Sequence, residues 1–196
     1  MGAYRGREGQ IWYGADDPCL PGPSPITAIE EPYRLHHNPV MPPMDSTRIT
    51  TLLKRDPLRW HVMGLVEALG LPQGCIGAGF VRNLVWDRLH GRCSDCRDED
   101  IDVLFYDPAK ADAAYDAEIE ADLRERAPGL TWSVKNQARM HLRNGDAPYA
   151  SVEDAMRFWP ETATAIACLR RDDECSMIAP FGTGDLIHLI LRPTST

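Results

Sequence analysis

A strand–turn–helix unit over residues 75–89 constrains the fold more than any other part of the chain. Residues 75–80 form a short apolar run of small side chains, and residues 81–89 continue with a helical apolar pattern that Gly91 ends. Small residues between a strand and a helix let a phosphate approach the backbone, and a helix N-terminus offers unpaired N–H groups and a positive dipole. This unit therefore predicts an anion site around Gly77 and Gly79.

Two aspartates lie at the start of the next predicted strand, over residues 101–106. Asp100 and Asp102 occupy positions i and i+2, so both side chains project from the same face. Ile101 and Val103 fill the alternate, buried positions. Two carboxylates placed so close repel each other unless a divalent cation lies between them. The pair predicts a cation site.

The rest of the chain alternates helical and strand patterns. Helices are predicted from the Asp56-Pro57 pair to Gly70, over residues 111–126 and over residues 151–159. Strands are predicted over residues 130–134 and as a hairpin, 164–169 and 176–179, around a charged turn; residues 186–191 fit either a helix or a strand. This alternation favours one α/β or α+β domain with a mixed sheet over residues 44–196.

Residues 1–43 have a different composition. Eight of the sixteen prolines lie there, without helical or alternating apolar patterns, which predicts a disordered Pro-rich tail. The N-terminus has no apolar signal core, and no apolar run approaches the roughly 20 residues that span a bilayer. We therefore expect a cytoplasmic protein without membrane partners.

The charge of the chain bears on its partners. The formal net charge is -8, and between Asp95 and Arg126 twelve acidic residues face four basic ones, an excess of eight that equals that of the whole chain. An acidic chain is a poor binder of duplex DNA, because phosphate neutralisation needs clustered Lys and Arg. The acidic stretch is interpreted mainly as a solvated helix face and loop, with a cation site within it as the alternative.

Six cysteines are present, and two of them, Cys93 and Cys96, form a C-x-x-C pair. No second C-x-x-C or His pair completes a zinc site, and the pair lies in a polar loop instead of opening a helix after a strand. Ordinary thiols are therefore favoured over zinc or redox chemistry.

Several segments together resemble known nucleotidyltransferases. Residues 78–83 (Ala-Gly-Phe-Val-Arg-Asn) resemble the Gly-Gly-x-Val-Arg-Asp stretch of tRNA nucleotidyltransferases, and residues 100–102 resemble their Asp-x-Asp. Residues 132–141, 159–164 and 179–182 are similar to blocks of a family of small bacterial nucleotidyltransferase-like proteins, formerly of unknown function. The resemblance extends over about residues 56–193 and places the chain in the polymerase-beta-like nucleotidyltransferase superfamily.

This resemblance implies an α+β fold, the minimal polymerase-beta-like nucleotidyltransferase fold, with a short mixed sheet flanked by helices. It also implies that Asp100 and Asp102 are the catalytic metal ligands and hold Mg²⁺ or Mn²⁺, with NTP phosphates over Gly77 and Gly79. The expected reaction transfers NMP from NTP to an unidentified acceptor.

Further nucleotide contacts are expected on both sides of this pair. Arg82 and Asn83 lie in the first turn of the helix that follows the glycines, where an arginine can bind phosphate in forked geometry. Lys135, Asn136 and Arg139 surround one predicted strand end and are interpreted as ligands of the triphosphate or the acceptor. In the alternative interpretation, Asn136 caps the next helix and Arg139 pairs with acids.

A second function stays open, because active members of the superfamily usually carry a third acid on a neighbouring strand. The corresponding residues here are Thr131, Ser133 and Lys135. The alternative is therefore a catalytically silent nucleotide-binding or regulatory relative. A small molecule or a protein is expected as the acceptor in preference to tRNA, since the sequence has no long basic surface studded with aromatic residues.

Overall fold

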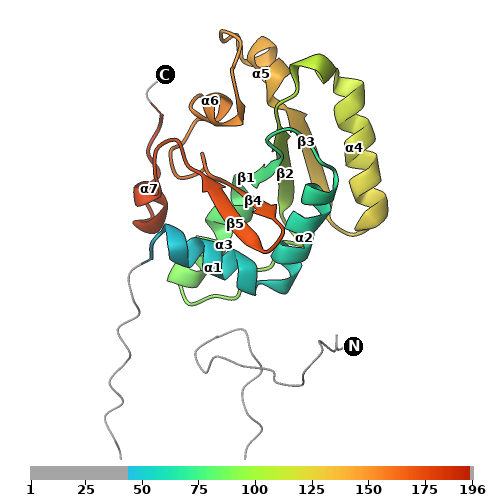
Figure 1. Ribbon diagram of the computed structural model, residues 1–196. Helices are drawn as coiled ribbons and strands as arrows, with labels where there is room; N and C mark the ends of the chain where they lie inside the picture. Colours follow the sequence, from blue (N-terminus) through green and yellow to red (C-terminus); the bar gives the residue numbers. More distant parts are fainter. Residues whose placement is uncertain (1–43, 195–196) are drawn as a thin grey trace, which may run out of the picture.

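The computed structural model describes residues 44–194, and Figure 1 shows its helices around one sheet. The predicted tail, residues 1–43, lies outside the described residues. The elements follow in the order α1 (Ser46–Arg55), α2 (Pro57–Ala68), β1 (Cys75–Gly77), α3 (Gly79–Leu89), β2 (Asp100–Phe105), the 3-10 helix η1 (Pro108–Lys110), α4 (Ala113–Arg126), β3 (Thr131–Asn136), α5 (Gln137–Asn144), α6 (Val152–Met156), β4 (Ala167–Arg171), β5 (Glu174–Ile178) and α7 (Gly184–Ile187).

The sheet has five strands in the order β3-β2-β1-β4-β5. The pair β2–β3 is parallel and the other three pairs are antiparallel, which confirms the predicted mixed sheet. The connection from β2 to β3 runs through α4, which lies along β3 in Figure 1. The hairpin β4–β5 closes at Asp172 and Asp173, within the predicted charged turn.

Polar side chains begin several of these helices where the sequence predicts a start. Asp56 accepts hydrogen bonds from the N–H groups of Leu58 and Arg59 at the start of α2, with Pro57 as the first helical residue. Ser151 caps α6 in the same way through the N–H of Asp154. These local hydrogen bonds explain why the two helix starts are readable from the sequence.

The two faces of the sheet carry different cores. Ile101, Val103 and Phe105 of β2 are fully buried in the main cluster, together with residues of α1, α2 and α3. Leu104, on the opposite face, belongs to a smaller cluster with Val152 and neighbouring side chains of α6 and β4. The alternation along β2 therefore puts Asp100 and Asp102 on the face that has the smaller core.

The structure differs from the predictions in several segments. The strand predicted over residues 75–80 ends at Gly77, because the chain turns at Ala78 and the next helix already begins at Gly79. Of the segment 186–191, which fitted either type, only the first two residues are helical, as the end of α7. The helix α1 was not predicted. None of the helices in residues 44–194 is long and apolar enough to cross a membrane.

Candidate active site

The turn between β1 and α3 is built around Ala78. This residue has φ 55° and ψ −126°, a backbone conformation that favours glycine, and its N–H donates to Ile166 O at 3.0 Å. Its side chain cannot cap α3, so no side-chain hydrogen bond serves the first turn of the helix. The start of α3 thus has no side-chain cap from residue 78, which leaves its first N–H groups as candidate donors to an anion.

The two glycines of the turn have different surroundings. A Cβ atom on Gly77 would lie 3.0 Å from Leu104 Cδ1 and 3.1 Å from Trp159 Cη2, so close packing demands glycine there. A Cβ atom on Gly79 would have polar neighbours, Asn83 Nδ2 at 3.3 Å and Glu99 Oε2 at 3.8 Å. Packing therefore accounts for Gly77, and Gly79 is the glycine with a polar environment.

The aspartate pair lies next to this turn. Asp102 is directly opposite Gly77 in the antiparallel pair β1–β2, and residues opposite each other point to the same face. Asp100 is exposed, whereas Asp102 is half-buried. Burial raises the pKa of Asp102 and the nearby Asp100 charge raises it further, while a hydrogen bond with Ser133 and the charge of Lys135 lower it. A cation at this pair would favour the ionised form of both carboxylates.

The strand β3 provides no third carboxylate. Its parallel register with β2 sets Thr131 opposite Asp100 and Ser133 opposite Asp102. Within residues 44–194, no three or more His, Cys, Asp and Glu side chains come together as a metal-binding group. The structure therefore offers two carboxylates and a serine hydroxyl at this position.

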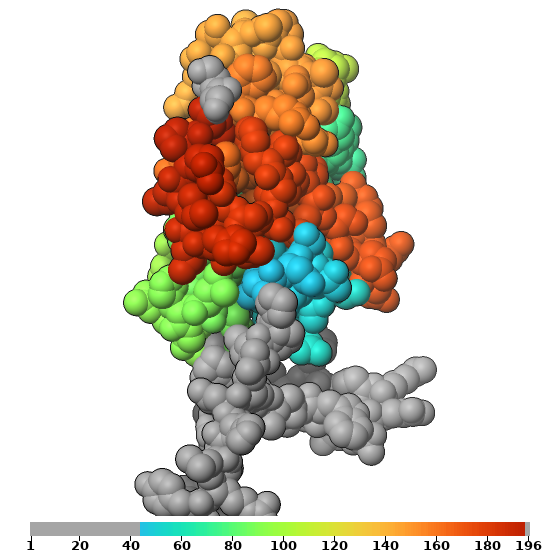
Figure 2. Space-filling view, turned by 90° about the vertical axis from the view of Figure 1, so that its left-hand side faces the viewer, coloured from blue at the N-terminus to red at the C-terminus, as the bar shows by residue number. Residues whose placement is uncertain are grey.

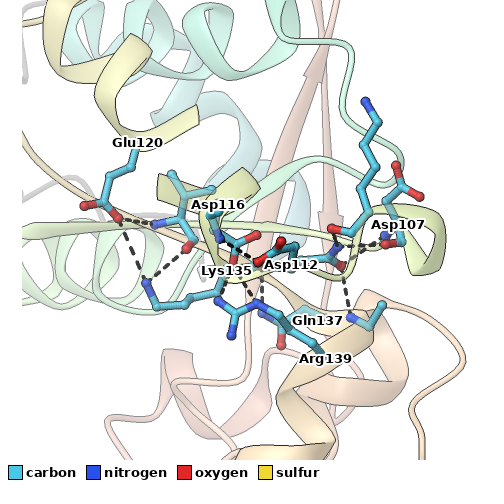
Figure 3. A network of polar contacts seen from close by, with 12 residues as sticks. Asp107, Asp112, Asp116, Glu120, Lys135, Gln137 and Arg139 are labelled. Carbon is cyan, nitrogen blue, oxygen red and sulfur yellow. Dashed lines mark hydrogen bonds and ion pairs between the residues drawn. The ribbon is translucent and has the colours of Figure 1, made fainter. Parts of the chain in front are cut away.

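The predicted ligand Lys135 lies at the outer edge of β3 (Figure 3). Its Nζ donates to Val134 O at 3.0 Å and lies 4.0 Å from Glu120 Oε2. The same glutamate accepts the Val134 N–H at 3.1 Å. Lys135 thus helps to join α4 to β3, and its charge still reaches Asp102.

Asn136, the second predicted ligand at this strand end, is fully buried. Its amide nitrogen donates to Asp107 O at 2.7 Å and to Lys110 O at 3.0 Å, and its oxygen accepts the N–H groups of Asp107 and Ala138, both at 3.1 Å. The side chain therefore uses its full hydrogen-bonding capacity within the protein. Capping of α5, the alternative interpretation of Asn136, is confirmed; its contact with a nucleotide stays a prediction.

Arg139 has a protein partner as well. Its guanidinium forms an ion pair with the buried Asp116, and its Nε donates to Asp116 Oδ2 at 3.0 Å. The same carboxylate oxygen accepts the N–H of Asn136 at 3.1 Å. Figure 3 shows this network between α4, β3 and α5. Pairing of Arg139 with an acid is confirmed, and its role in binding stays a prediction.

Arg82 and Asn83 lie closer to the turn. Arg82 donates from Nη1 to Thr164 Oγ1 at 2.9 Å and from Nε to Asn83 Oδ1 at 3.1 Å, and its guanidinium carbon lies 5.2 Å from the centre of the Trp86 ring. Thr164 belongs to the segment that precedes β4. The structure thus brings Gly79, Arg82 and Asn83 together at the start of α3.

A buried arginine that no sequence motif predicted, Arg59, lies below the turn. The side chain of Arg59 is fully buried, and its Nε donates to Phe80 O at 3.1 Å. It also donates to Asp56 Oδ2 at 2.9 Å, Ser94 Oγ at 3.0 Å and Glu99 Oε1 at 3.3 Å. Arg59 therefore connects α2, α3 and the residue before Asp100. No motif marks it; the only signal is an arginine within the apolar pattern of a helix.

Glu99 is partly buried beside this arginine. Burial raises the pKa of the Glu99 carboxyl, and the Arg59 charge and the Asn83 amide lower it. Its Oε2 is buried and has no hydrogen-bond partner among the described residues. The negative charge of Glu99 is thus stabilised mainly by Arg59.

Cys96, one half of the C-x-x-C pair, is a free thiol in the core. Burial raises its pKa to about 11; the charge of Arg59 lowers it and nearby carboxylates raise it, both by smaller amounts. A thiol with so high a pKa is a poor nucleophile at neutral pH.

Comparison with known proteins identifies the class to which this fold and this site belong. The chain matches a nucleotidyltransferase family over residues 64–196. A solved structure described as revealing a CCA-adding enzyme head domain superposes with a TM-score of 0.69 at 30% identity, covering 76% of this chain and 79% of that one. A tRNA-processing enzyme in an apo form gives a TM-score of 0.45 at 20% identity, covering 68% of this chain and 37% of that one. No curated protein matches the chain.

The fold is thus that of a nucleotidyltransferase, with a glycine turn and an Asp-x-Asp strand side by side. The chain belongs to the nucleotidyltransferase family that it matches over residues 64–196, as the sequence resemblance predicted. Family and fold together support a nucleotidyl-transfer function.

Proposed function

We propose that this protein is a divalent-cation-dependent nucleotidyltransferase that moves NMP from NTP to an acceptor. The observation that carries the proposal is the register of β1 with β2, which places Asp102 directly opposite Gly77 at the entry to α3. Two carboxylates on one strand face and the open start of a helix are thereby neighbours. They suit a cation and a polyphosphate, respectively.

In this proposal each residue has a defined task. Asp100 and Asp102 hold Mg²⁺ or Mn²⁺, which would offset the negative charge of the triphosphate and the leaving pyrophosphate. The N–H groups at Gly79 and the following residues of α3 bind phosphate oxygens. Arg82, held by Thr164, contributes positive charge at the same helix end. Lys135 adds a more distant charge from β3.

Binding experiments test the metal and nucleotide parts. We expect wild-type protein to bind ATP with Mn²⁺ and to lose most of this affinity when Mn²⁺ is omitted or in Asp100→Asn/Asp102→Asn. Asp173→Asn is the matched control, because this exposed aspartate lies in the β4–β5 turn. Absence of cation-dependent binding of any NTP by the wild type would refute the proposal.

One observation favours a second candidate, a nucleotide-binding relative without catalytic activity. Thr131 and Ser133 stand on β3 beside the aspartates, where a third acid would bind a second cation. Incubation with α-labelled NTPs and cell extract separates the two candidates. Transfer leaves a labelled adduct and pyrophosphate, whereas a silent relative binds NTP and produces neither.

The acceptor in this proposal is a small molecule or a protein. The similar solved structure is described as a CCA-adding enzyme head domain, which makes tRNA the natural comparison. We therefore include purified tRNA as a separate acceptor arm in the same labelling assay. Labelled tRNA would overturn the proposed acceptor class while leaving nucleotidyl transfer intact.

A further inference from the structure

The segment between α6 and β4 forms one wall of the candidate site. Ile166 O accepts the N–H of Ala78 at 3.0 Å, and Thr164 Oγ1 accepts a hydrogen bond from Arg82 at 2.9 Å. At the other end of this segment, Trp159 Cη2 lies 3.1 Å from the position of a Cβ atom on Gly77. The wall thus contacts the glycine turn at Gly77 and Ala78, and helix α3 at Arg82.

The indole of Trp159 lies on the same face of the sheet as the aspartates. A Cβ on Gly77 would point to the face from which Asp102 projects, because the two residues are directly opposite in an antiparallel pair. Trp159 occupies the space next to that Cβ position and packs against the smaller core cluster. The residue as a whole is only partly buried, and its ring contacts the turn at Gly77, the residue opposite Asp102.

The C-terminal residues hold this wall in place. Thr194 donates from its N–H to Pro160 O at 3.1 Å and from its hydroxyl to Trp159 O at 2.5 Å. Thr162 N–H donates to Arg192 O at 3.0 Å, and Arg192 pairs with Asp185. Figure 2 shows the C-terminal segment covering this side of the molecule between α1 and the residues coloured orange. These hydrogen bonds hold the backbone at Trp159 and Pro160. A backbone that is already held loses less entropy when a ligand binds.

We propose that Trp159 is the stacking surface for the base of the bound nucleotide. This inference rests on the proposed function, because it assigns the base end of the ligand whose phosphates the start of α3 would bind. Aromatic rings stack on every base, since each base has a π face, so Trp159 contributes affinity without selecting one NTP. The neighbouring Gly77 is required because the ring packs directly on it.

Comparison of two ligands tests the inference. ATP and inorganic tripolyphosphate, each with Mn²⁺, are titrated into wild-type protein, Trp159→Leu and Trp159→Phe. Stacking of a base on an aromatic side chain contributes substantially to nucleotide affinity. Trp159→Leu should therefore weaken ATP binding about tenfold or more. Tripolyphosphate has no base, so its affinity should change less than about twofold, and Trp159→Phe should keep most of the ATP affinity.

Trp60→Leu is the matched control, because Trp60 is another half-buried tryptophan and lies on α2. It should leave both affinities unchanged. Equal losses for ATP and tripolyphosphate in Trp159→Leu, or an unchanged ATP affinity, would overturn the stacking role while leaving the phosphate and metal site intact. If the wild type binds neither ligand, the proposed function itself fails. Thermal unfolding of each variant confirms that the protein titrated is folded.

Discussion

Replacement of Arg59 by methionine tests whether a buried ion-pair network supports the glycine turn and the aspartate strand. The side chain is fully buried and donates to Asp56, Ser94, Glu99 and the carbonyl oxygen of Phe80. Methionine preserves much of the apolar stem but provides no donor. Asp56 keeps the two N–H groups that it caps, whereas Glu99 loses the one ion-pair partner that it has within residues 44–194.

The expected loss of stability follows from the charge that remains. Removing one partner of a buried ion pair typically destabilises a protein by about 3–5 kcal/mol, because the other charge is left uncompensated. Glu99 is only partly buried, so we expect a loss near the lower end of this range. With a urea dependence of about 2 kcal/mol per M, the unfolding midpoint of Arg59→Met should fall by about 2 M. Native domains have roughly 5–15 kcal/mol of stability, so the variant should still fold in the absence of urea.

The stability that Arg59→Met loses should depend on pH in a predictable direction. The pKa of Glu99 is already raised above its ordinary value of 4.5, mainly by burial, and Arg59 lowers it. Without Arg59 the folded-state pKa rises further, so the folded protein takes up a proton more readily than the unfolded chain. The stability deficit of Arg59→Met is therefore largest at neutral pH and shrinks as the pH falls toward 4.5.

Urea unfolding at pH 7 and at pH 5 measures both effects, with Glu99→Gln and the double variant Arg59→Met/Glu99→Gln alongside. The double variant should recover a large part of the loss, because glutamine carries no charge. The reasoning is refuted if Arg59→Met loses less than about 1 kcal/mol, or if the double variant is no more stable than the single one at pH 7.

Three smaller changes give further tests by chemical or thermal unfolding. Ala78→Gly should stabilise the protein by about 1 kcal/mol, because relief of the strain at φ 55° exceeds the entropy that glycine loses on folding; a loss would contradict this. Gly77→Ala should destabilise by about 1–3 kcal/mol, because its Cβ has no room, whereas Gly184→Ala, with open space, should stay within about 0.5 kcal/mol. Equal effects at the two glycines would disprove the packing argument. The pKa of Asp185 is lowered to about 2 by hydrogen bonds from Arg192 and Thr162, so its contribution exists above pH 3.8 and disappears as the pH falls toward 2. Asp185→Asn should lower the melting temperature at neutral pH and weaken its dependence on pH in that interval, and an unchanged pH profile would exclude this role.

Local patterns in the sequence were sufficient to predict much of the fold. The apolar alternation along β2 indicates which side chains are buried, and it places Asp100 and Asp102 on the other face without further information. Asp56 and Ser151 mark helix starts because a cap needs only a side chain and an N–H two or three residues away. These features depend on neighbours in the chain, and the sequence contains those neighbours explicitly.

Contacts between distant segments were not predictable in this way. Asn136 and Arg139 are polar residues near a strand end, which matches a ligand site and a structural network equally well. Only the folded chain shows that Asn136 already donates a hydrogen bond to Asp107 O and Arg139 to the Asp116 carboxylate.

The sequence by itself determined the short elements, the caps and the face on which the aspartates lie. The tertiary structure decided that Arg59 supports the turn, that Trp159 packs on Gly77 and that Thr164 holds Arg82. The physical reason is the distance along the chain over which each interaction acts. Periodicity and capping act over a few residues, whereas burial and ion pairing depend on which segments meet, and the sheet order β3-β2-β1-β4-β5 brings those segments together.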